Sequence, residues 1–339
     1  MTTIASRGAR LIALILIIII GVYVLAAVIP ASACYSGENP LMNDGRTPVI
    51  VAHRGGADEF PENTLEAFYN AYSVDENVIM ETDVNLTKDG VLILLHNERL
   101  DATTNVTGLA SDWNYTDLIA QRVNFGYDNP TEDTVLAGER EYFTVGGEPR
   151  LPTDVTYPEG VTARDSEIYL ATTLEELLVA FPDNIISVEI KQGGSIGIRA
   201  AKEAVRLIEK YDAFDRVILT SFHDLVTLEL KRMQWQGEVP SSFMRAPGII
   251  GVARFYVAMT LGIGSLYTDN IAVLEISTGE LGLDFATEKL IKKAHERNLA
   301  VCYWTINDEE EMRYLIGLGA DAIMTDSPSL LKKVLDEYK

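Results

Sequence analysis

The stretch that decides the fold spans residues 49–56 and reads Val49-Ile50-Val51-Ala52-His53-Arg54-Gly55-Gly56. Small and β-branched residues lead straight into a histidine, an arginine and two glycines. Such a run is typical of a buried parallel strand that stops at a loop. His53 and Arg54 then stand at the carboxyl end of a strand, where α/β folds carry their chemistry. The alternative is a core histidine beside a surface arginine, and the rest of the chain decides between the two.

Strand and helix patterns alternate along most of the chain. Strands are predicted at residues 78–84, 91–96, 185–191, 217–222, 301–306 and 322–325, and helices at 64–73, 173–178, 197–211, 225–233, 285–297 and 309–318. This alternation predicts a parallel sheet covered by helices, and about eight units fit a closed (β/α)8 TIM barrel better than an open sheet. Residues 241–244 and 271–276 are both candidates for the sixth strand.

One long segment interrupts the alternation. Residues 111–169 are rich in turn chemistry, such as Gly146-Gly147-Glu148-Pro149. A weakly structured segment of this length in a compact domain predicts an insertion, here after the third strand, that covers a site or contacts a partner.

The charge balance limits the possible partners. The chain has 339 residues, with 28 basic and 50 acidic side chains and a formal net charge of −22. Nucleic acid is excluded as a partner because its phosphate backbone needs a basic face. An acidic surface also repels small anions, so any phosphate site needs local positive charge from Arg, Lys or a metal.

The amino terminus predicts a membrane anchor. Arg7 and Arg10 precede residues 11–29, which carry no charge, and Pro30 closes the run. The run is long enough to span a bilayer, and the basic residues before it predict that the bulk of the chain lies outside the cytoplasm. Cleavage after residues 31–33 and lipidation of Cys34 are the alternatives. We therefore expect an anchor at 1–30, a linker at 31–48 and a catalytic domain at 49–339.

A second apolar stretch covers residues 251–267, with Arg254 as its one charged residue. It is short and interrupted by glycine, which favours a buried barrel helix over a membrane span. The alternative is a membrane-facing element near the mouth of the active site.

Charged residues gather at the ends and inner faces of the predicted strands. Glu81 and Asp83 share one face of their strand, because strand side chains alternate, and Glu189 and Lys191 share a face of another. Carboxylates at such positions need pairing or a metal. All-oxygen ligands favour one divalent cation, Mg²⁺ or Ca²⁺. The alternative is that Lys191 and Arg54 pair with these acids as structural salt bridges.

Two of the four histidines, His53 and His96, end predicted strands. A histidine pair near a metal is a plausible acid–base couple at neutral pH. The residues do not tell which histidine is the acid and which the base.

These segments together resemble the glycerophosphodiester phosphodiesterase family. The resemblance runs in the family's order through His53-Arg54-Gly55, Pro61-Glu62-Asn63-Thr64, Glu81-Thr82-Asp83-Val84, Thr87-Lys88-Asp89-Gly90, His96, Glu189-Ile190-Lys191, Ser221-Phe222, Trp304-Thr305-Ile306-Asn307 and Thr325-Asp326-Ser327-Pro328. It covers residues from about 49 to 330, and 111–169 and 237–268 match poorly. Each motif is modest evidence, but the ordered set is specific.

The resemblance implies a TIM barrel with an insertion after the third strand. It implies roles for nine residues: metal ligands Glu81, Asp83 and Glu189, acid–base histidines His53 and His96, phosphate contacts Arg54 and Lys191, and a glycerol-side wall of Trp304 and Phe222. Two positions depart from the family's pattern. Asn97 replaces a usual aspartate after the second histidine, and Ala102 replaces a usual arginine, which bears on substrate preference and rate.

The expected function is metal-dependent hydrolysis of glycerophosphodiesters to glycerol 3-phosphate and an alcohol. One alternative is a related phosphodiesterase that acts on lysophospholipids or sphingomyelin in membranes. Another is a silent barrel used for binding, for which Asn97 is the one supporting feature.

Overall fold

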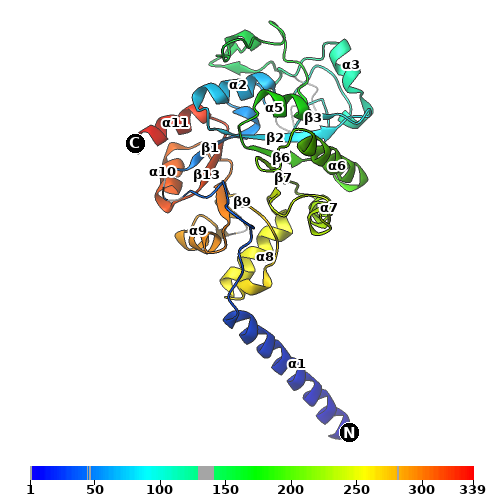
Figure 1. The fold of residues 1–339 in the computed structure, drawn as a ribbon, viewed down its shortest axis with the longest axis vertical. Coiled ribbons are helices and arrows are strands. Elements are labelled where there is room, and N and C mark those ends of the chain that lie inside the picture. Colours follow the sequence, from blue (N-terminus) through cyan, green and yellow to red (C-terminus); the bar gives the residue numbers. More distant parts are fainter. Residues whose placement is uncertain (1, 44, 46, 129–140, 281) are drawn as a thin grey trace.

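The structure is a computed structural model of the full chain, and it describes all residues except 1, 44, 46, 129–140 and 281. A long helix, α1 (Thr2–Val28), projects from a rounded α/β domain (Figure 1).

Eight parallel strands form a barrel. They are β1 (Val49–Ala52), β2 (Ile79–Leu86), β6 (Ile186–Ile190), β7 (Val217–Thr220), β8 (Met244–Arg245), β9 (Val273–Ile276), β12 (Ala300–Tyr303) and β13 (Ala322–Thr325). Their order around the sheet is β8-β7-β6-β2-β1-β13-β12-β9. At the seam, the backbone N–H of Ala272 donates to the carbonyl of Arg245 over 2.9 Å, which nearly closes the barrel.

Helices cover the outside of the barrel (Figure 1). They are α2 (Leu65–Val74), α5 (Leu174–Ala180), α6 (Gly194–Lys210), α7 (Asp224–Trp235), α8 (Ile249–Thr260), α9 (Glu288–His295), α10 (Glu309–Leu318) and α11 (Pro328–Asp336). The helix α5, which the sequence predicts at 173–178, opens with a capping box at Thr173. Thr173 accepts from the N–H of Glu176, and the Glu176 carboxylate accepts from the N–H of Thr173.

One predicted strand differs from the expectation. Residues 91–96 contain β3 (Leu92–Leu94), which pairs antiparallel with β2 and is not a barrel strand. A turn at residues 88–90 folds the chain back on β2, and a turn this short can join antiparallel strands only. The eightfold count still holds because both candidates for the sixth strand, β8 and β9, belong to the barrel.

The insertion after β3 is a packed layer. Within its described part lie η2 (Ala110–Asp112), α3 (Tyr115–Ala120), the hairpin β4 (Thr144–Val145) and β5 (Glu148–Pro149), and η3 (Pro152–Asp154). Arg164 ties it to the barrel through a salt bridge to the buried carboxylate of Glu66 on α2, 3.2 Å away. The insertion therefore packs against α2.

Residues 31–48 are more than the linker that was expected. Tyr35 is buried and its hydroxyl donates to the carbonyl of Ser242, while Leu41 packs into the barrel interior. The side chain of Asn39 donates to the carbonyls of Ala272 and Asn298. These contacts lie just before β8, β9 and β12, so the segment covers the amino-terminal end of the barrel.

Candidate active site

All nine predicted site residues line one cavity of about 160 Å³ at the carboxyl end of the strands. They are His53, Arg54, Glu81, Asp83, His96, Glu189, Lys191, Phe222 and Trp304. They come from segments up to about 250 residues apart in the chain, and only barrel closure brings them together. The sequence prediction that these residues share one site is consistent with this geometry.

His53 and Arg54 lie in a tight turn, η1 (His53–Gly55), directly after β1. Arg54 has a φ of 53°, and Gly55 has a φ of 88°. A Cβ on Gly55 would lie 2.7 Å from the Cβ of Ala67 on α2. Glycine is thus required both by the backbone conformation and by the close approach to α2.

His53 is held by a carboxylate. Its Nδ1 lies 2.6 Å from Oδ1 of Asp326, which follows β13, and the Nδ2 of Asn307 donates to the other oxygen of Asp326 over 2.7 Å. Burial lowers the pKa of His53, but the Asp326 hydrogen bond and the charge of Glu81 outweigh it. The pKa of His53 is therefore raised above its ordinary value.

His96 has a different environment. Its Nδ1 lies 2.9 Å from Oδ1 of Asn97. An amide oxygen only accepts, so Nδ1 donates and Nε2 of the neutral ring is left as a proton acceptor. Burial lowers the pKa of His96, the charge of Asp83 opposes this, and Arg54 and Lys191 keep the pKa below its ordinary value.

Three carboxylates form the wall between the histidines. Glu81 and Asp83 project from β2, and Asp83 pairs in register with Glu189 on β6. The backbone N–H of Arg54 donates to Oε2 of Glu81 over 2.9 Å. Burial and the neighbouring charge of Asp83 raise the pKa of Glu81 to about 8. His53 and Arg54 oppose this rise in pKa but do not cancel it.

Two cations lie against these acids. Nζ of Lys191 is 3.0 Å from Glu189 and 3.4 Å from Asp83, and Nε of Arg54 is 3.4 Å from Asp83. Within the described residues, no three His, Cys, Asp or Glu side chains form a ready-made metal site. The donor chemistry nevertheless fits a hard cation, because three carboxylate groups line one cavity and carboxylate oxygens are the ligands that such cations prefer.

An aromatic pair flanks the polar wall. The rings of Phe222 and Trp304 are 6.0 Å apart, and Nζ of Lys191 lies 5.7 Å from the Phe222 ring centre. Phe222 is 44% exposed, so it lies at the rim of the cavity. The wall offers an apolar surface beside the side chain of Lys191.

Sequence reasoning missed Glu275 as a site residue and did not connect Asp326 to His53. Glu275 on β9 lines the cavity and accepts from the Ser187 hydroxyl over 2.8 Å. Burial raises the pKa of Glu275 to about 7. A charged residue in the middle of the apolar run 271–276 was the available signal. For Asp326, the signal was its position directly after a predicted strand.

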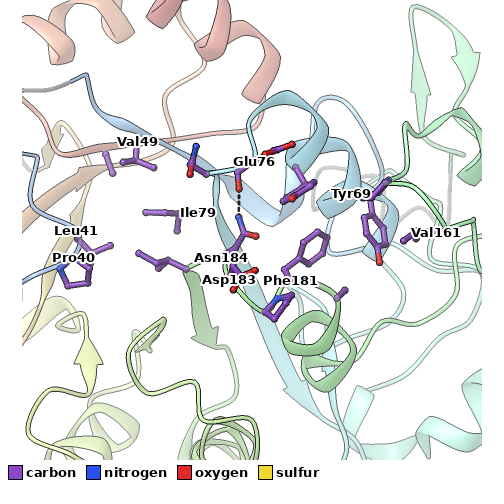
Figure 2. A pocket seen from close by; sticks show the side chains of 17 residues that line it. Pro40, Leu41, Val49, Tyr69, Glu76, Ile79, Val161, Phe181, Asp183 and Asn184 are labelled. Carbon is purple, nitrogen blue, oxygen red and sulfur yellow. Dashed lines mark hydrogen bonds between the residues drawn. The ribbon is translucent and has the colours of Figure 1, made fainter.

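A larger cavity, of about 660 Å³, lies at the opposite end of the barrel (Figure 2). Pro40 and Leu41 line it together with Val49 and Ile79, at the amino-terminal ends of β1 and β2. None of the nine predicted residues lines it. In barrels of this kind the chemistry lies at the carboxyl ends, so the smaller cavity is the candidate active site.

Comparison with known proteins identifies the family. Residues 53–330 match the sequence model of the glycerophosphoryl diester phosphodiesterase family. The chain belongs to this family. The protein is accordingly an enzyme, a phosphoric diester hydrolase.

Named relatives span most of the chain. A glycerophosphodiester phosphodiesterase of Caldanaerobacter subterraneus is 25% identical over 285 residues, covering 84% of this chain and 96% of its own. The human lysophospholipase D GDPD3 is 27% identical over 319 residues, covering 88% of this chain and 89% of its own. The chain therefore resembles members named for two kinds of substrate.

Solved structures confirm the barrel fold. The glycerophosphoryl diester phosphodiesterase domain of a Mycobacterium tuberculosis protein has a TM-score of 0.63 at 19% identity, covering 85% of this chain and 98% of its own. A phosphodiesterase of Oleispira antarctica, solved with its product sn-glycerol-3-phosphate, has a TM-score of 0.59 at 19% identity, covering 86% of this chain and 97% of its own.

Proposed function

We propose that the enzyme hydrolyses glycerophosphodiesters to glycerol 3-phosphate and an alcohol, with His53 as general acid and His96 as general base. The observation that carries this assignment is the contrast between the two rings in one cavity. His53 has a carboxylate partner and a raised pKa, whereas His96 has an amide partner and a lowered pKa. Titratable groups whose pKa values are pushed apart in this way are suited to opposite roles.

The reaction then follows from the residues. Arg54 and Lys191 bind the phosphate oxygens. The Nε2 of His96 removes a proton from the nucleophile, which is water or the neighbouring hydroxyl of the substrate. As the nucleophile's oxygen bonds to phosphorus, the bond to the leaving oxygen breaks, and protonated His53 gives its proton to that oxygen. In the second route, water then opens the cyclic ester.

We further propose that Glu81, Asp83 and Glu189 hold one divalent cation, Mg²⁺ or Ca²⁺. When bound, such a cation stabilises negative charge that develops on the phosphoryl oxygens. The burial of Glu81 beside Asp83, which raises the pKa of Glu81, supports this proposal because a bound cation would stabilise the charged carboxylates. With a cation held by these carboxylates, Lys191, which pairs with Asp83 and Glu189, would be available to the substrate phosphate.

The test is a product analysis with the full-length protein and glycerophosphocholine. Hydrolysis of the ester bond between phosphate and choline, as proposed, releases glycerol 3-phosphate and choline. Release of glycerol and phosphocholine instead would contradict the assignment of the leaving group. A boiled sample and the His53→Ala variant serve as controls for contaminating activity.

Lysophospholipids are the second candidate substrates. The relatives named lysophospholipase D and the exposed aromatic rim at Phe222 favour them. Comparing kcat/KM for glycerophosphocholine, lysophosphatidylcholine and sphingomyelin decides between these substrates. The remaining alternative from the sequence, a barrel without catalysis, has lost its support because the chain belongs to an enzyme family.

We also propose that α1 anchors the enzyme, with the barrel outside the cytoplasm. Among the described residues, one helix is long and apolar enough to cross a bilayer, over Gly8–Val28. At 1.5 Å per residue its 21 residues extend about 31 Å, close to the thickness of the hydrocarbon core. Protease protection of the barrel in sealed, right-side-out cells would contradict this orientation.

A further inference from the structure

The helix α8 carries an apolar stripe that the catalytic function does not use. Its exposed positions Ile250, Ala253, Arg254, Val257 and, just past its end, Leu261 follow helical spacing along one face. Ile250, Val257 and Leu261 are each about half exposed. A shallow hollow of about 380 Å³ lies along this face and continues to Leu266. Isolated surface leucines are ordinary, but a continuous stripe marks an interaction surface.

This face continues directly into the anchor helix. The Tyr23 hydroxyl on α1 donates to the carbonyl of Leu261 over 3.1 Å, and the Ser265 hydroxyl donates to the carbonyl of Ala26. In Figure 1, α8 runs crosswise to α1, just above its carboxyl-terminal end. A helix that lies in the membrane interface has this orientation relative to a helix that crosses the membrane.

The position along α1 of the contact between Tyr23 and Leu261 also agrees with an interfacial α8. Tyr23 lies five positions before the end of α1 at Val28, which is about 7.5 Å along the helix. Interfacial helices bury their apolar face about 5–10 Å into the boundary between headgroups and acyl chains. Tyrosine itself is enriched at this level of a bilayer. Once α1 spans the membrane, Leu261 is therefore brought to the interface.

Three lysines of α9 lie beside this face, although Lys293 pairs with Glu296 and Asp284 lines the same groove. Lys289 and Lys293 of α9 line a groove with Met259 and Thr260 at the end of α8, and Lys292 is exposed on the same helix. On the stripe itself, Arg254 pairs with Asp269 and lies over the ring of Tyr267. Lysines beside an apolar face are suited to the phosphates of anionic lipids.

We propose that the α8 face and the α9 lysines form a docking surface for the outer leaflet of the bilayer that holds α1. The residues before α8 connect this surface to the active site, because Pro247 lines the catalytic cavity two residues before Ile249. The barrel is thereby held on the lipid surface, and the amino-terminal end of α8 leads from this surface to the catalytic cavity. This inference rests on the proposed anchoring by α1.

The test uses the full chain in liposomes of phosphatidylcholine and phosphatidylglycerol. An environment-sensitive fluorophore is attached to Leu261→Cys on the docking surface, to Val179→Cys on α5 as a matched exposed control, and to Leu16→Cys within α1. Both native cysteines, Cys34 and Cys302, are buried, and labelled wild type measures their background reaction. Nitroxide-bearing lipids then quench any fluorophore within the bilayer, and turnover of glycerophosphocholine confirms folding.

We expect quenching at positions 16 and 261 to be at least ~2-fold stronger than at 179, with blue-shifted emission at 261. Quenching at 16 but not at 261 would overturn the docking surface and leave the anchor in place. A second copy of the chain found to cover α8 would likewise overturn the docking surface and leave the anchor in place. Absence of quenching at 16 as well would overturn both. Lys289→Glu with Lys292→Glu should reduce the dependence of the signal at 261 on phosphatidylglycerol, and an unchanged dependence removes the lysines from the proposal.

Discussion

At the scale of single residues, the two histidines differ in the group that holds Nδ1. Asp326 accepts from His53 with a full negative charge, which stabilises the imidazolium form. Asn97 offers His96 a neutral oxygen, which orients the ring without favouring its protonation. Asn97, where the family usually has aspartate, is therefore compatible with His96 as a general base. The substitution does not require a loss of activity.

The first prediction concerns both histidines. His53→Ala and His96→Ala should each reduce kcat by at least ~100-fold, because each removes a proton-transfer group. The matched control is His295→Gln, which keeps a donor for the buried Asp321 outside the cavity. Steady-state kinetics on glycerophosphocholine measures the effect, and near-wild-type turnover of either alanine variant removes that histidine from the mechanism.

The second prediction concerns the pH profile. The raised pKa of His53 keeps the acid protonated to higher pH, so activity is lost as the pH rises through that value. Asp326→Asn removes the charge that raises this pKa, so the basic limb of kcat/KM should move to lower pH. Asp58→Asn, a neighbouring acid bonded to Ser327, should leave the limb in place. An unmoved limb in Asp326→Asn contradicts the role of His53 as the acid.

The third prediction concerns the metal. Chelation with EDTA should abolish turnover, and Mg²⁺ or Ca²⁺ should restore it, because the cation stabilises the developing phosphoryl charge. Glu81→Gln should weaken the apparent affinity for the added metal. Glu275→Gln, a buried carboxylate in the same cavity that is not a predicted ligand, should leave it nearly unchanged. Full activity after chelation refutes the metal assignment.

At the scale of elements, the turn after β1 positions His53. Gly55 permits a left-handed backbone and a close approach to α2 at the same place. A side chain here would push η1 away from α2 and displace His53 and Arg54 from the cavity. Gly55 is thus needed to keep His53 and Arg54 in the cavity at the end of β1.

The fourth prediction tests this turn. Gly55→Ala should destabilise the protein through a positive φ, costing about 1–2 kcal/mol, and through overpacking against Ala67, costing about 1–3 kcal/mol more. Gly90→Ala is the control, because Gly90 has a φ of 85° and a Cβ added there would meet nothing within 4 Å. Chemical denaturation compares the two, and equal losses would show that the approach to α2 is unimportant.

At the scale of the whole molecule, the described residues between α1 and β1 cover the amino-terminal end of the barrel. Asn39 is buried and bonds two backbone carbonyls near the starts of β9 and β12. The segment therefore couples α1 to the barrel through packed contacts, which fixes the direction from which the anchor leaves the domain.

The fifth prediction tests that coupling. Asn39→Ala leaves the carbonyls of Ala272 and Asn298 without this donor, so the free energy of unfolding should fall by about 1–3 kcal/mol. Ser36→Ala removes an exposed hydrogen bond to Ser241 and should cost much less. Thermal or chemical denaturation measures both, and an unaffected Asn39→Ala variant would mean that the segment is a simple linker.

The sequence by itself predicted the barrel and the convergence of nine candidate residues in one cavity, because strand-end motifs in a parallel barrel converge whatever their separation in the chain. Tertiary structure alone decided that residues 91–96 turn back antiparallel to β2, that residues 31–48 cover the barrel, and that Asp326 holds His53. Period and composition describe how a segment buries its side chains. They do not record which segment it pairs with, and the pKa contrast between His53 and His96 depends on those partners.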